Sequence, residues 1–278
     1  MDKIGLTGAD GFVGTHLVKR LKNEGYDLLI SDCNLNHHIP SFEDCKHVIH
    51  LAALTFVPQS WEQPNLFYQT NTVGTAHVLE AVRKANIPLT YISSYVYGNP
   101  QYLPIDEEHE LIPSNPYMQS KIMAEEICNF YRENFDLEIC ILRPFNLYGS
   151  GLSKKFLIPL ICEQVLDKNK KKIHLRSLTP KRDYIHIDDL ISAILKSIKR
   201  PNSESINIAS GDSYNVKEIA EMIMNICSIH KEIVSDGTIR LNEIMDTKAD
   251  ISLAKKVLDW KPQVKIETGI EKIISEMK

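Results

Sequence analysis

Residues 7–14 read TGADGFVG and lie between a strand-like segment, KIGLT (3–7), and a helix-like one, GFVGTHLVKRLKNEG (11–25). Glycines at such a junction let the backbone turn tightly and approach a pyrophosphate, whose charge the free amides of the helix N-terminus stabilise. The context predicts the phosphate-binding turn of a dinucleotide site, and an ordinary tight turn is the alternative. The residues expected at the cofactor are Gly8, Gly11, Phe12, Val13 and Gly14.

Short apolar strands alternate with amphipathic helices over the first half of the chain. This pattern is typical of βαβ units and a parallel sheet covered on both faces. The sequence therefore predicts an α/β fold, a Rossmann-type doubly wound parallel sheet with a smaller C-terminal α/β substrate lobe. The expected nucleotide-binding lobe spans 1–147 plus about 183–209, and the second lobe spans about 148–182 plus 210–278. The chain is expected to cross back to the first lobe once.

Composition narrows the class of protein. The chain has 278 residues, a net charge of −4 and a pI near 6.2. General nucleic-acid binding needs an excess of positive charge, which this composition does not have. Its six cysteines are scattered without a C-x-x-C pair, so we expect reduced thiols and no metal site. Neither a leader nor a membrane-length apolar run is visible, and a cytoplasmic protein is expected.

Asp32 closes the second predicted strand, 18 residues after Gly14. A carboxylate there can bind both hydroxyls of an adenine ribose and would repel a 2′-phosphate, which favours NAD over NADP. A turn aspartate is the alternative. Only about a dozen residues separate Asp32 from Cys45, so part of the adenine pocket must come from this short segment. Cofactor preference is accordingly less determined than Asp32 alone suggests.

The segment SNPYMQSKIMAEE (114–126) begins a helix, with Ser114 or Asn115 as the cap and Pro116 at the first helical position. Tyr117 and Lys121 then share a face, one turn apart. Spacing alone does not make them a catalytic pair, because a chain with eleven tyrosines and many lysines gives about one Y-x-x-x-K by chance.

Further motifs make the pair significant. They are TGADGFVG (7–14), HLAA (50–53), NTVGT (71–75), SSYVYG (93–98), YMQSK (117–121), RPFNLYG (143–149), RDYIHIDD (182–189) and ADISLAKKVLDWKP (249–262). In this order they resemble the extended short-chain dehydrogenase/reductases that act on nucleotide sugars, the epimerase/dehydratase group. The resemblance covers nearly the whole chain.

The resemblance implies a catalytic set of Ser93, Tyr117 and Lys121. Tyr117 would be the acid/base, and Ser93 would hydrogen-bond the reacting oxygen, with Ser94 as its near rival. A free phenol, with a pKa of about 10, is too weak a base at neutral pH. The Lys121 ammonium and an oxidised nicotinamide would favour the phenolate. Along the cofactor the resemblance also places Leu51, Ala52 and Ala53, together with Tyr117 and Lys121, and Lys121 would hold the nicotinamide ribose.

Asn146, Arg182 and Arg240 match family positions that contact the nucleotide diphosphate. Arginine suits phosphate oxygens because its planar guanidinium donates two parallel hydrogen bonds. Ser94 and Tyr95 would line the sugar site. The family's 4,6-dehydratases carry an Asp-Glu pair at these two positions, and its absence argues against 4,6-dehydration.

Three functions remain open. The first is an NAD-dependent nucleotide-sugar 4-epimerase, favoured because Asp32 favours NAD. The second is a 4-keto-6-deoxysugar reductase that consumes NAD(P)H, and the third is a non-catalytic regulator that senses NAD(H). The resemblance implies a homodimer paired through the helix of Tyr117 and the long helix before it, without nucleic-acid or membrane partners. Asp188 and Asp189 are expected to cap a helix, and His50 and His186 to be packed residues.

Overall fold

A six-stranded parallel sheet organises the larger lobe. The computed structural model describes residues 2–238 and 243–278. In the sheet the strand order is β2-β1-β3-β4-β5-β9, and the order turns back at β1, between β2 and β3. In such sheets ligands bind at the carboxyl ends of the strands near the point where the order reverses. The strands are β1 (Lys3–Thr7), β2 (Asp27–Ser31), β3 (His47–His50), β4 (Leu89–Ile92), β5 (Ile139–Pro144) and β9 (Ser205–Ile208).

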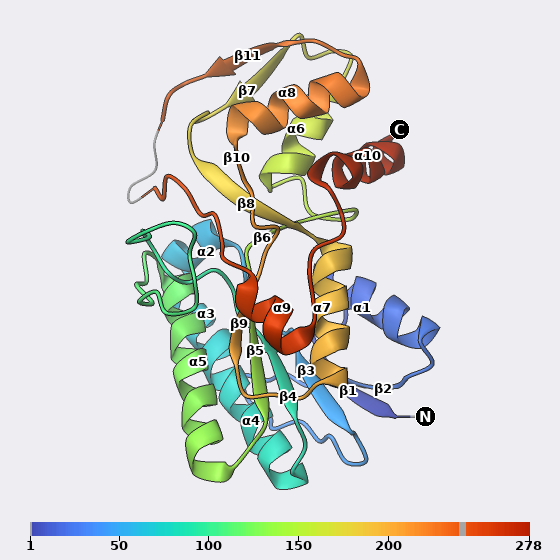
Figure 1. Ribbon diagram of the computed structural model, residues 1–278, viewed down its shortest axis with the longest axis vertical. Coiled ribbons are helices and arrows are strands. Elements are labelled where there is room, and N and C mark those ends of the chain that lie inside the picture. Colours follow the sequence, from blue (N-terminus) through green and yellow to red (C-terminus); the bar gives the residue numbers. More distant parts are fainter. Residues whose placement is uncertain (1, 239–242) are drawn as a thin grey trace.

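Helices cover both faces of this sheet, as the alternating pattern predicts (Figure 1). One face packs against α1 (Phe12–Asn23), α7 (Ile187–Lys199) and α9 (Ser252–Leu258). The other packs against α4 (Gly74–Ala85) and α5 (Pro116–Phe135). The chain reaches α4 through α2 (Val57–Glu62), α3 (Pro64–Phe67) and a π-helix (Tyr68–Val73), which follow one another closely.

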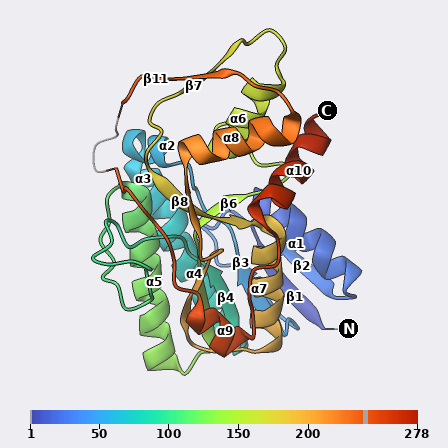
Figure 2. The same cartoon turned by 45° about the horizontal axis from the view of Figure 1, so that its top comes forward.

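The smaller lobe lies above the carboxyl ends of the large sheet (Figures 1 and 2). It contains a sheet of order β10-β8-β6 and a two-stranded ladder of β7 and β11. Three helices share an apolar core with these strands. The elements are β6 (Asn146–Tyr148), α6 (Leu157–Leu166), β7 (Lys172–Leu175), β8 (Lys181–His186), β10 (Ser213–Asn215), α8 (Val216–Cys227), β11 (Glu232–Ser235) and α10 (Ile266–Met277).

Two expectations about the C-terminal half are wrong in detail. The chain returns to the larger lobe twice, first as α7 and β9 and again as α9, because Leu258 and Trp260 are buried in the core beneath that sheet. Helix α7 is capped by the His186 side chain, which accepts a hydrogen bond from the Asp188 amide. Asp189 instead uses its carboxylate to accept the amides of Gln263 and Val264. The other lobe boundaries stay a prediction.

The short segment after β2 folds back over the sheet. Leu35, Phe42 and Cys45 are buried against the α4 side, and the Phe42 ring occupies the space beside Gly5. Within the described residues no further strand pairs with β2, which leaves β2 at the edge of the sheet. The shortened connection therefore removes an outer strand without opening the core. In the described part of the chain, no helix is long and apolar enough to span a bilayer.

Candidate active site

The glycine turn has the shape of a phosphate cradle. Gly8 has a φ of +71°, and a Cβ there would lie 2.6 Å from the Ala52 nitrogen. A Cβ on Gly14 would overlap the Gly8 carbonyl oxygen, whereas one on Gly11 would meet only that oxygen, at 3.5 Å. No described side chain caps the N-terminus of α1. Its first amides therefore stay available to an anion, and the turn fits a dinucleotide pyrophosphate.

The other expected cofactor residues gather at the same edge of the sheet. Asp32 follows β2 directly and is exposed. Leu51 and Ala52 follow β3, where their amides donate to the Thr7 carbonyl oxygen and hydroxyl, each at 3.3 Å. Ala53 comes next and is partly exposed. Since β2, β1 and β3 are adjacent, these side chains border the carboxyl ends of three neighbouring strands.

Helix α5 begins as the sequence predicts and carries the expected pair. The Asn115 side chain accepts the Met118 amide at 2.9 Å, and Pro116 occupies the first turn. Tyr117 and Lys121 both lie on the buried face, 9% and 2% exposed. A pair on the wet side of the helix would have had no such burial. The structure therefore excludes a solvated pair, and the catalytic role of the two residues stays a prediction.

Lys121 is held at the end of β4. Its Nζ donates to the Ile92 carbonyl oxygen at 2.7 Å and lies 4.3 Å from the centroid of the Tyr91 ring. Burial lowers the pKa of Lys121 to about 7, although Glu125 and Cys128 act in the opposite direction. In the protein alone, desolvation thus disfavours the charged form of the lysine.

Burial also raises the pKa of Tyr117, and a side-chain hydrogen bond with Ser94 lowers it in part. The net direction in the protein alone is thus opposite to the lowering expected for a catalytic base. The expected lowering depends on charge beside the phenol, and an oxidised nicotinamide would bring such a charge.

Ser93 follows β4 and lies next to this pair in the fold. Its amide donates to the Leu142 carbonyl oxygen at 2.8 Å, which fixes the backbone. The hydroxyl is buried and has no hydrogen-bond partner among the described residues. Buried hydroxyls in native proteins nearly always have a partner, so this one is available to a bound oxygen. Ser94 is half-buried beside it and interacts with Tyr117.

Asn71 was not identified from the sequence as a site residue. It lies in the π-helix and is 1% exposed. Its side chain accepts the Leu54 amide at 2.8 Å and donates to the Leu54 carbonyl oxygen and the Ser120 hydroxyl, at 3.0 and 2.9 Å. It thereby ties the loop after β3 to α5, next to Lys121. A signal was present, because Asn71 is the first residue of the motif NTVGT (71–75).

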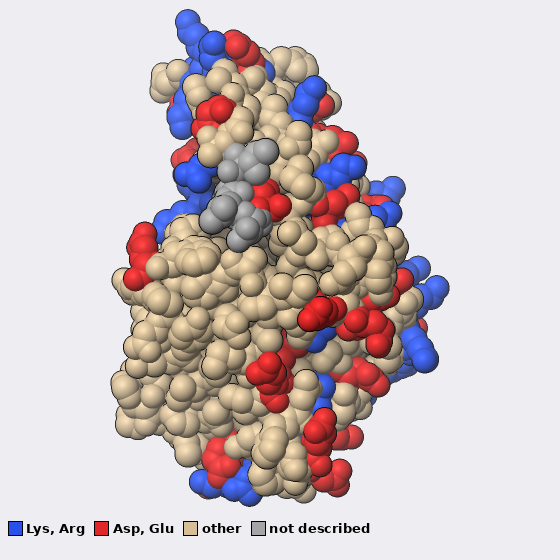
Figure 3. Space-filling view, turned by 90° about the vertical axis from the view of Figure 1, so that its left-hand side faces the viewer, with Lys and Arg blue, Asp and Glu red and all other residues tan. Residues whose placement is uncertain are grey.

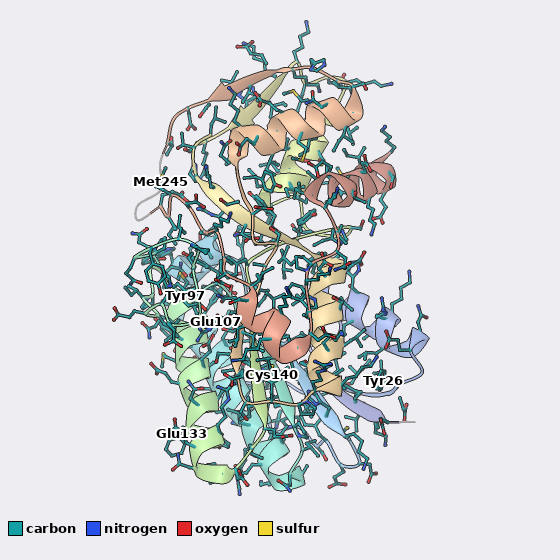
Figure 4. All side chains as sticks on the ribbon, in the orientation of Figure 1. Tyr26, Tyr97, Glu107, Glu133, Cys140 and Met245 are labelled. Carbon is teal, nitrogen blue, oxygen red and sulfur yellow. The ribbon has the colours of Figure 1, made fainter. Side chains whose placement is uncertain are left out.

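A buried network also holds α5 against the sheet. The Arg143 guanidinium donates to both carboxylate oxygens of Glu125, the shortest bond being 2.6 Å, and to the Tyr97 hydroxyl at 2.8 Å. The Tyr97 hydroxyl donates to the side-chain oxygen of Asn207 at 2.6 Å, and the backbone amide of Asn207 donates to the Glu107 carboxylate. Figure 4 labels Tyr97 and Glu107 near the upper end of α5. The network joins α5, β5 and β9 to the loop that precedes α5.

The expected substrate residues lie where the two lobes meet. Asn146 and Arg182 are on neighbouring strands, β6 and β8. Arg182 forms an ion pair with Glu243, donates to the Ile244 carbonyl oxygen at 2.6 Å, and lowers the pKa of Tyr95 while burial raises it. The Asn146 amide donates to the Asp183 carbonyl oxygen at 3.3 Å. Arg240 lies outside the described residues.

Asp183 is a second residue that the sequence did not single out. Its buried carboxylate accepts the Ser210 amide and hydroxyl at 2.8 and 2.7 Å, and the amides of Gly211 and Ala249 at 2.9 and 3.3 Å. Burial outweighs these bonds and raises its pKa to about 6. The residue joins β8 to two distant segments and so fixes the strand that carries Arg182.

Two alanine substitutions in the glycine turn should separate folding from cofactor binding. Gly14→Ala should lower the melting temperature by several degrees, because the new methyl group overlaps backbone that cannot move. Gly11→Ala should melt close to the wild type but bind NAD at least about tenfold more weakly, because a methyl group in this turn would hinder the close approach of a pyrophosphate to the backbone. Thermal melts and calorimetric titration would check both, and equal stability of the two variants would contradict the overlap.

Comparison with known proteins places this geometry in a family. Residues 30–273 match the family of GDP-mannose 4,6 dehydratase. The GDP-6-deoxy-D-talose 4-dehydrogenase of Aggregatibacter actinomycetemcomitans is 30% identical, over 99% of this chain and 96% of that protein. The UDP-glucose 4-epimerase of Lactobacillus helveticus is 28% identical, over 94% of this chain and 92% of that protein.

The fold comparison agrees. The solved structure of RMD from Pseudomonas aeruginosa, complexed with NADPH, has a TM-score of 0.91 and 28% sequence identity, and the match covers 99% of this chain and 98% of that one. The chain therefore belongs to the GDP-mannose 4,6 dehydratase family, within the nucleotide-sugar epimerase/dehydratase group of the extended short-chain dehydrogenase/reductases.

Proposed function

We propose that the protein is an NAD-dependent 4-epimerase of a nucleotide diphosphate sugar. The observation that carries this proposal is the buried pair on α5. Tyr117 and Lys121 lie near Ser93, whose hydroxyl has no partner among the described residues, at the carboxyl edge of a sheet whose first turn fits a dinucleotide. Those residue types serve proton removal from a carbinol. The dinucleotide supplies the hydride acceptor and donor.

The chain's own residues then have separate tasks. Ser93 donates a hydrogen bond to the O4 oxygen of the sugar. Tyr117 takes the proton of that hydroxyl as the C4 hydride leaves, and returns it after the 4-keto sugar has turned over in the site. Lys121 holds positive charge beside the phenol, which favours the phenolate. The reaction consumes no cofactor, because hydride returns to the other face of C4.

Binding of the nucleotide diphosphate falls to the smaller lobe. Arg182 is 22% exposed in its side chain, and the ion pair with Glu243 orients its guanidinium. Asn146 on the adjacent strand can donate to the same phosphates. We retain Arg240 as a third contact on the resemblance alone. Ser94 and Tyr95 stand where dehydratases have acids, which disfavours 4,6-dehydration despite the family's name.

A 4-keto-6-deoxysugar reductase is the second candidate. The similarity to a GDP-6-deoxy-D-talose 4-dehydrogenase and to a structure with NADPH favours it. Against it, Asp32 follows β2 without a neighbouring arginine and would repel the 2′-phosphate of NADPH. The catalytic trio serves both reactions equally and does not separate them.

One assay distinguishes the candidates. The purified protein would first be tested for copurifying NAD, and then offered UDP-, GDP-, dTDP- and CDP-sugars and their 4-keto derivatives with NADH or NADPH. Isomerisation of a sugar without net change in cofactor supports the epimerase. Stoichiometric loss of absorbance at 340 nm with a keto sugar supports the reductase, and no turnover with any substrate would refute both.

A Tyr117→Phe variant should lose turnover by a factor of about 10² to 10⁴ and still bind NAD. The substitution removes only the hydroxyl, so the packing of the ring against Phe67 is kept. Tyr131→Phe, on the same helix, is the matched control and should keep wild-type turnover. Near-normal turnover of Tyr117→Phe would remove this residue as the acid/base.

An Arg182→Ala variant should bind UDP and GDP about 10- to 100-fold more weakly, because a charge-assisted bond to phosphate is lost. Lys181→Ala, whose exposed side chain belongs to the same strand, is the control. Calorimetric titration with the two nucleotides measures the effect. Unchanged dissociation constants in Arg182→Ala would reject the role.

We also propose a homodimer paired through α4 and α5. Seen from the α5 side, the lower part of the molecule carries a broad surface with few charges (Figure 3). Trp61, Val73 and Phe130, in or next to this helical layer, are exposed apolar residues. Burial of such side chains would stabilise a pair of subunits. Light scattering should give about twice the mass of 31.7 kDa, and a monomeric mass would contradict the proposal.

A further inference from the structure

A column of buried rings lies beneath Lys121. The Tyr91 ring on β4 has its centroid 4.3 Å from Nζ of Lys121, and the residue is 1% exposed. Behind it the His50 ring on β3 lies 5.6 Å away, tilted by 32°. Hydrogen bonds to Thr7 at 2.7 Å and Thr75 at 3.0 Å hold both nitrogens of His50. The aromatic face below the ammonium is therefore fixed in place.

Few other groups can stabilise a positive charge at this position. The Ile92 carbonyl oxygen accepts one hydrogen bond from Lys121. Glu125, one turn along α5, is already paired with the Arg143 guanidinium at 2.6 Å, which offsets its negative charge. Cys128 stays a neutral thiol because burial raises its pKa to about 12. Among the described residues, the groups that stabilise the Lys121 charge at close range are therefore the Ile92 carbonyl oxygen and the face of the Tyr91 ring.

His50 does not add a repelling charge. Burial and the neighbouring Lys121 lower its pKa to about 3, so the imidazole is neutral wherever the protein is folded near neutral pH. Tyr117, the remaining titratable group on this side of α5, is also neutral without a cofactor because burial raises its pKa. The groups that face Lys121 from β3, β4 and α5 are therefore uncharged or paired.

The Tyr91 hydroxyl has no partner of full hydrogen-bond geometry among the described residues, although the Thr75 side chain lies near enough to lower the Tyr91 pKa in part. A poorly bonded buried hydroxyl costs stability, so it does not explain a tyrosine at this position. The ring face does, because a desolvated cation over an aromatic ring is attracted by the quadrupole of the ring. Phenylalanine would supply that face equally well, which gives the position a clean control.

We propose that Tyr91 is a positioning residue whose ring face holds the Lys121 ammonium in its protonated form beside Tyr117. The contact with Lys121 is independent of the substrate. Only its consequence for catalysis rests on the proposed function. Loss of the ring leaves the ammonium with the Ile92 carbonyl oxygen alone, and the neutral amine becomes more favourable.

The direct test is a pH titration of Lys121 by NMR in the full-length protein labelled with ¹³C-lysine, with Lys121→Met identifying the resonance. Tyr91→Leu should lower the Lys121 pKa by about 0.5 to 1.5 units, the range of a buried cation–π contact. Tyr91→Phe should leave it within about 0.3 units of the wild type. An unchanged pKa in a folded Tyr91→Leu protein overturns the proposal, and so does an equal shift in Tyr91→Phe.

Tyr91→Met, with a flexible side chain, replaces Tyr91→Leu if the latter does not fold, and the same shift is expected. Where a substrate is turned over, the high-pH limb of kcat should move to lower pH in the leucine variant by the shift seen in NMR, because the protonated fraction of Lys121 falls. A wild-type protein without sugar turnover but with the NMR shift would refute the proposed function alone. A kcat limb that stays in place while the NMR shift occurs would refute the positioning role in catalysis.

Discussion

A lysine ammonium kept out of water is the constraint on which the rest of the site depends. Burial lowers the pKa of Lys121 to about 7, so its charge at neutral pH depends on whatever lies within a few ångströms of Nζ. The Ile92 carbonyl oxygen and the Tyr91 ring meet this need on the sheet side. In the proposed mechanism a dry surrounding would also strengthen the interaction between that charge and the Tyr117 phenol, because water would screen it. The desolvation that disfavours the charged lysine would then also make its charge act more strongly on the phenol.

Such a site works only if α5 keeps its position on the sheet. Asn71 fixes the helix at Ser120, and the Arg143–Glu125 pair fixes it one turn beyond Lys121. Breaking a buried ion pair by removal of one partner costs about 3–5 kcal/mol, since the remaining charge is left uncompensated. Asp183 likewise anchors the smaller lobe, because its carboxylate accepts backbone amides of Ser210 and Ala249 and so fixes the strand that carries Arg182. The residues proposed for catalysis and for binding thus lie on elements that are each held by separate buried contacts.

Most of the fold was predictable, because short apolar strands, amphipathic helices and the glycine turn each have a local physical signature. The Asn115 cap follows from residues close in sequence, whereas spacing alone did not decide whether Tyr117 and Lys121 are buried. What could not be predicted depends on tertiary contacts. β8 contains too many polar residues to look like a strand, His186 caps α7 through its own side chain, and α9 returns to the larger lobe to bury Trp260. The partners of Arg143 and Asp183 lie far apart in the chain, so no spacing reveals them.

The central claim is that the positive charge of Lys121 lowers the pKa of the Tyr117 phenol once an oxidised dinucleotide is bound, so that the phenolate can act as the base. An ultraviolet titration of tyrosinate absorbance, taken as the difference between the wild type and Tyr117→Phe with NAD present, measures the pKa of that phenol directly. The account predicts a pKa below the ordinary value of about 10, and one at least about one unit higher in a Lys121→Met background. An equal Tyr117 pKa in the two backgrounds would contradict it.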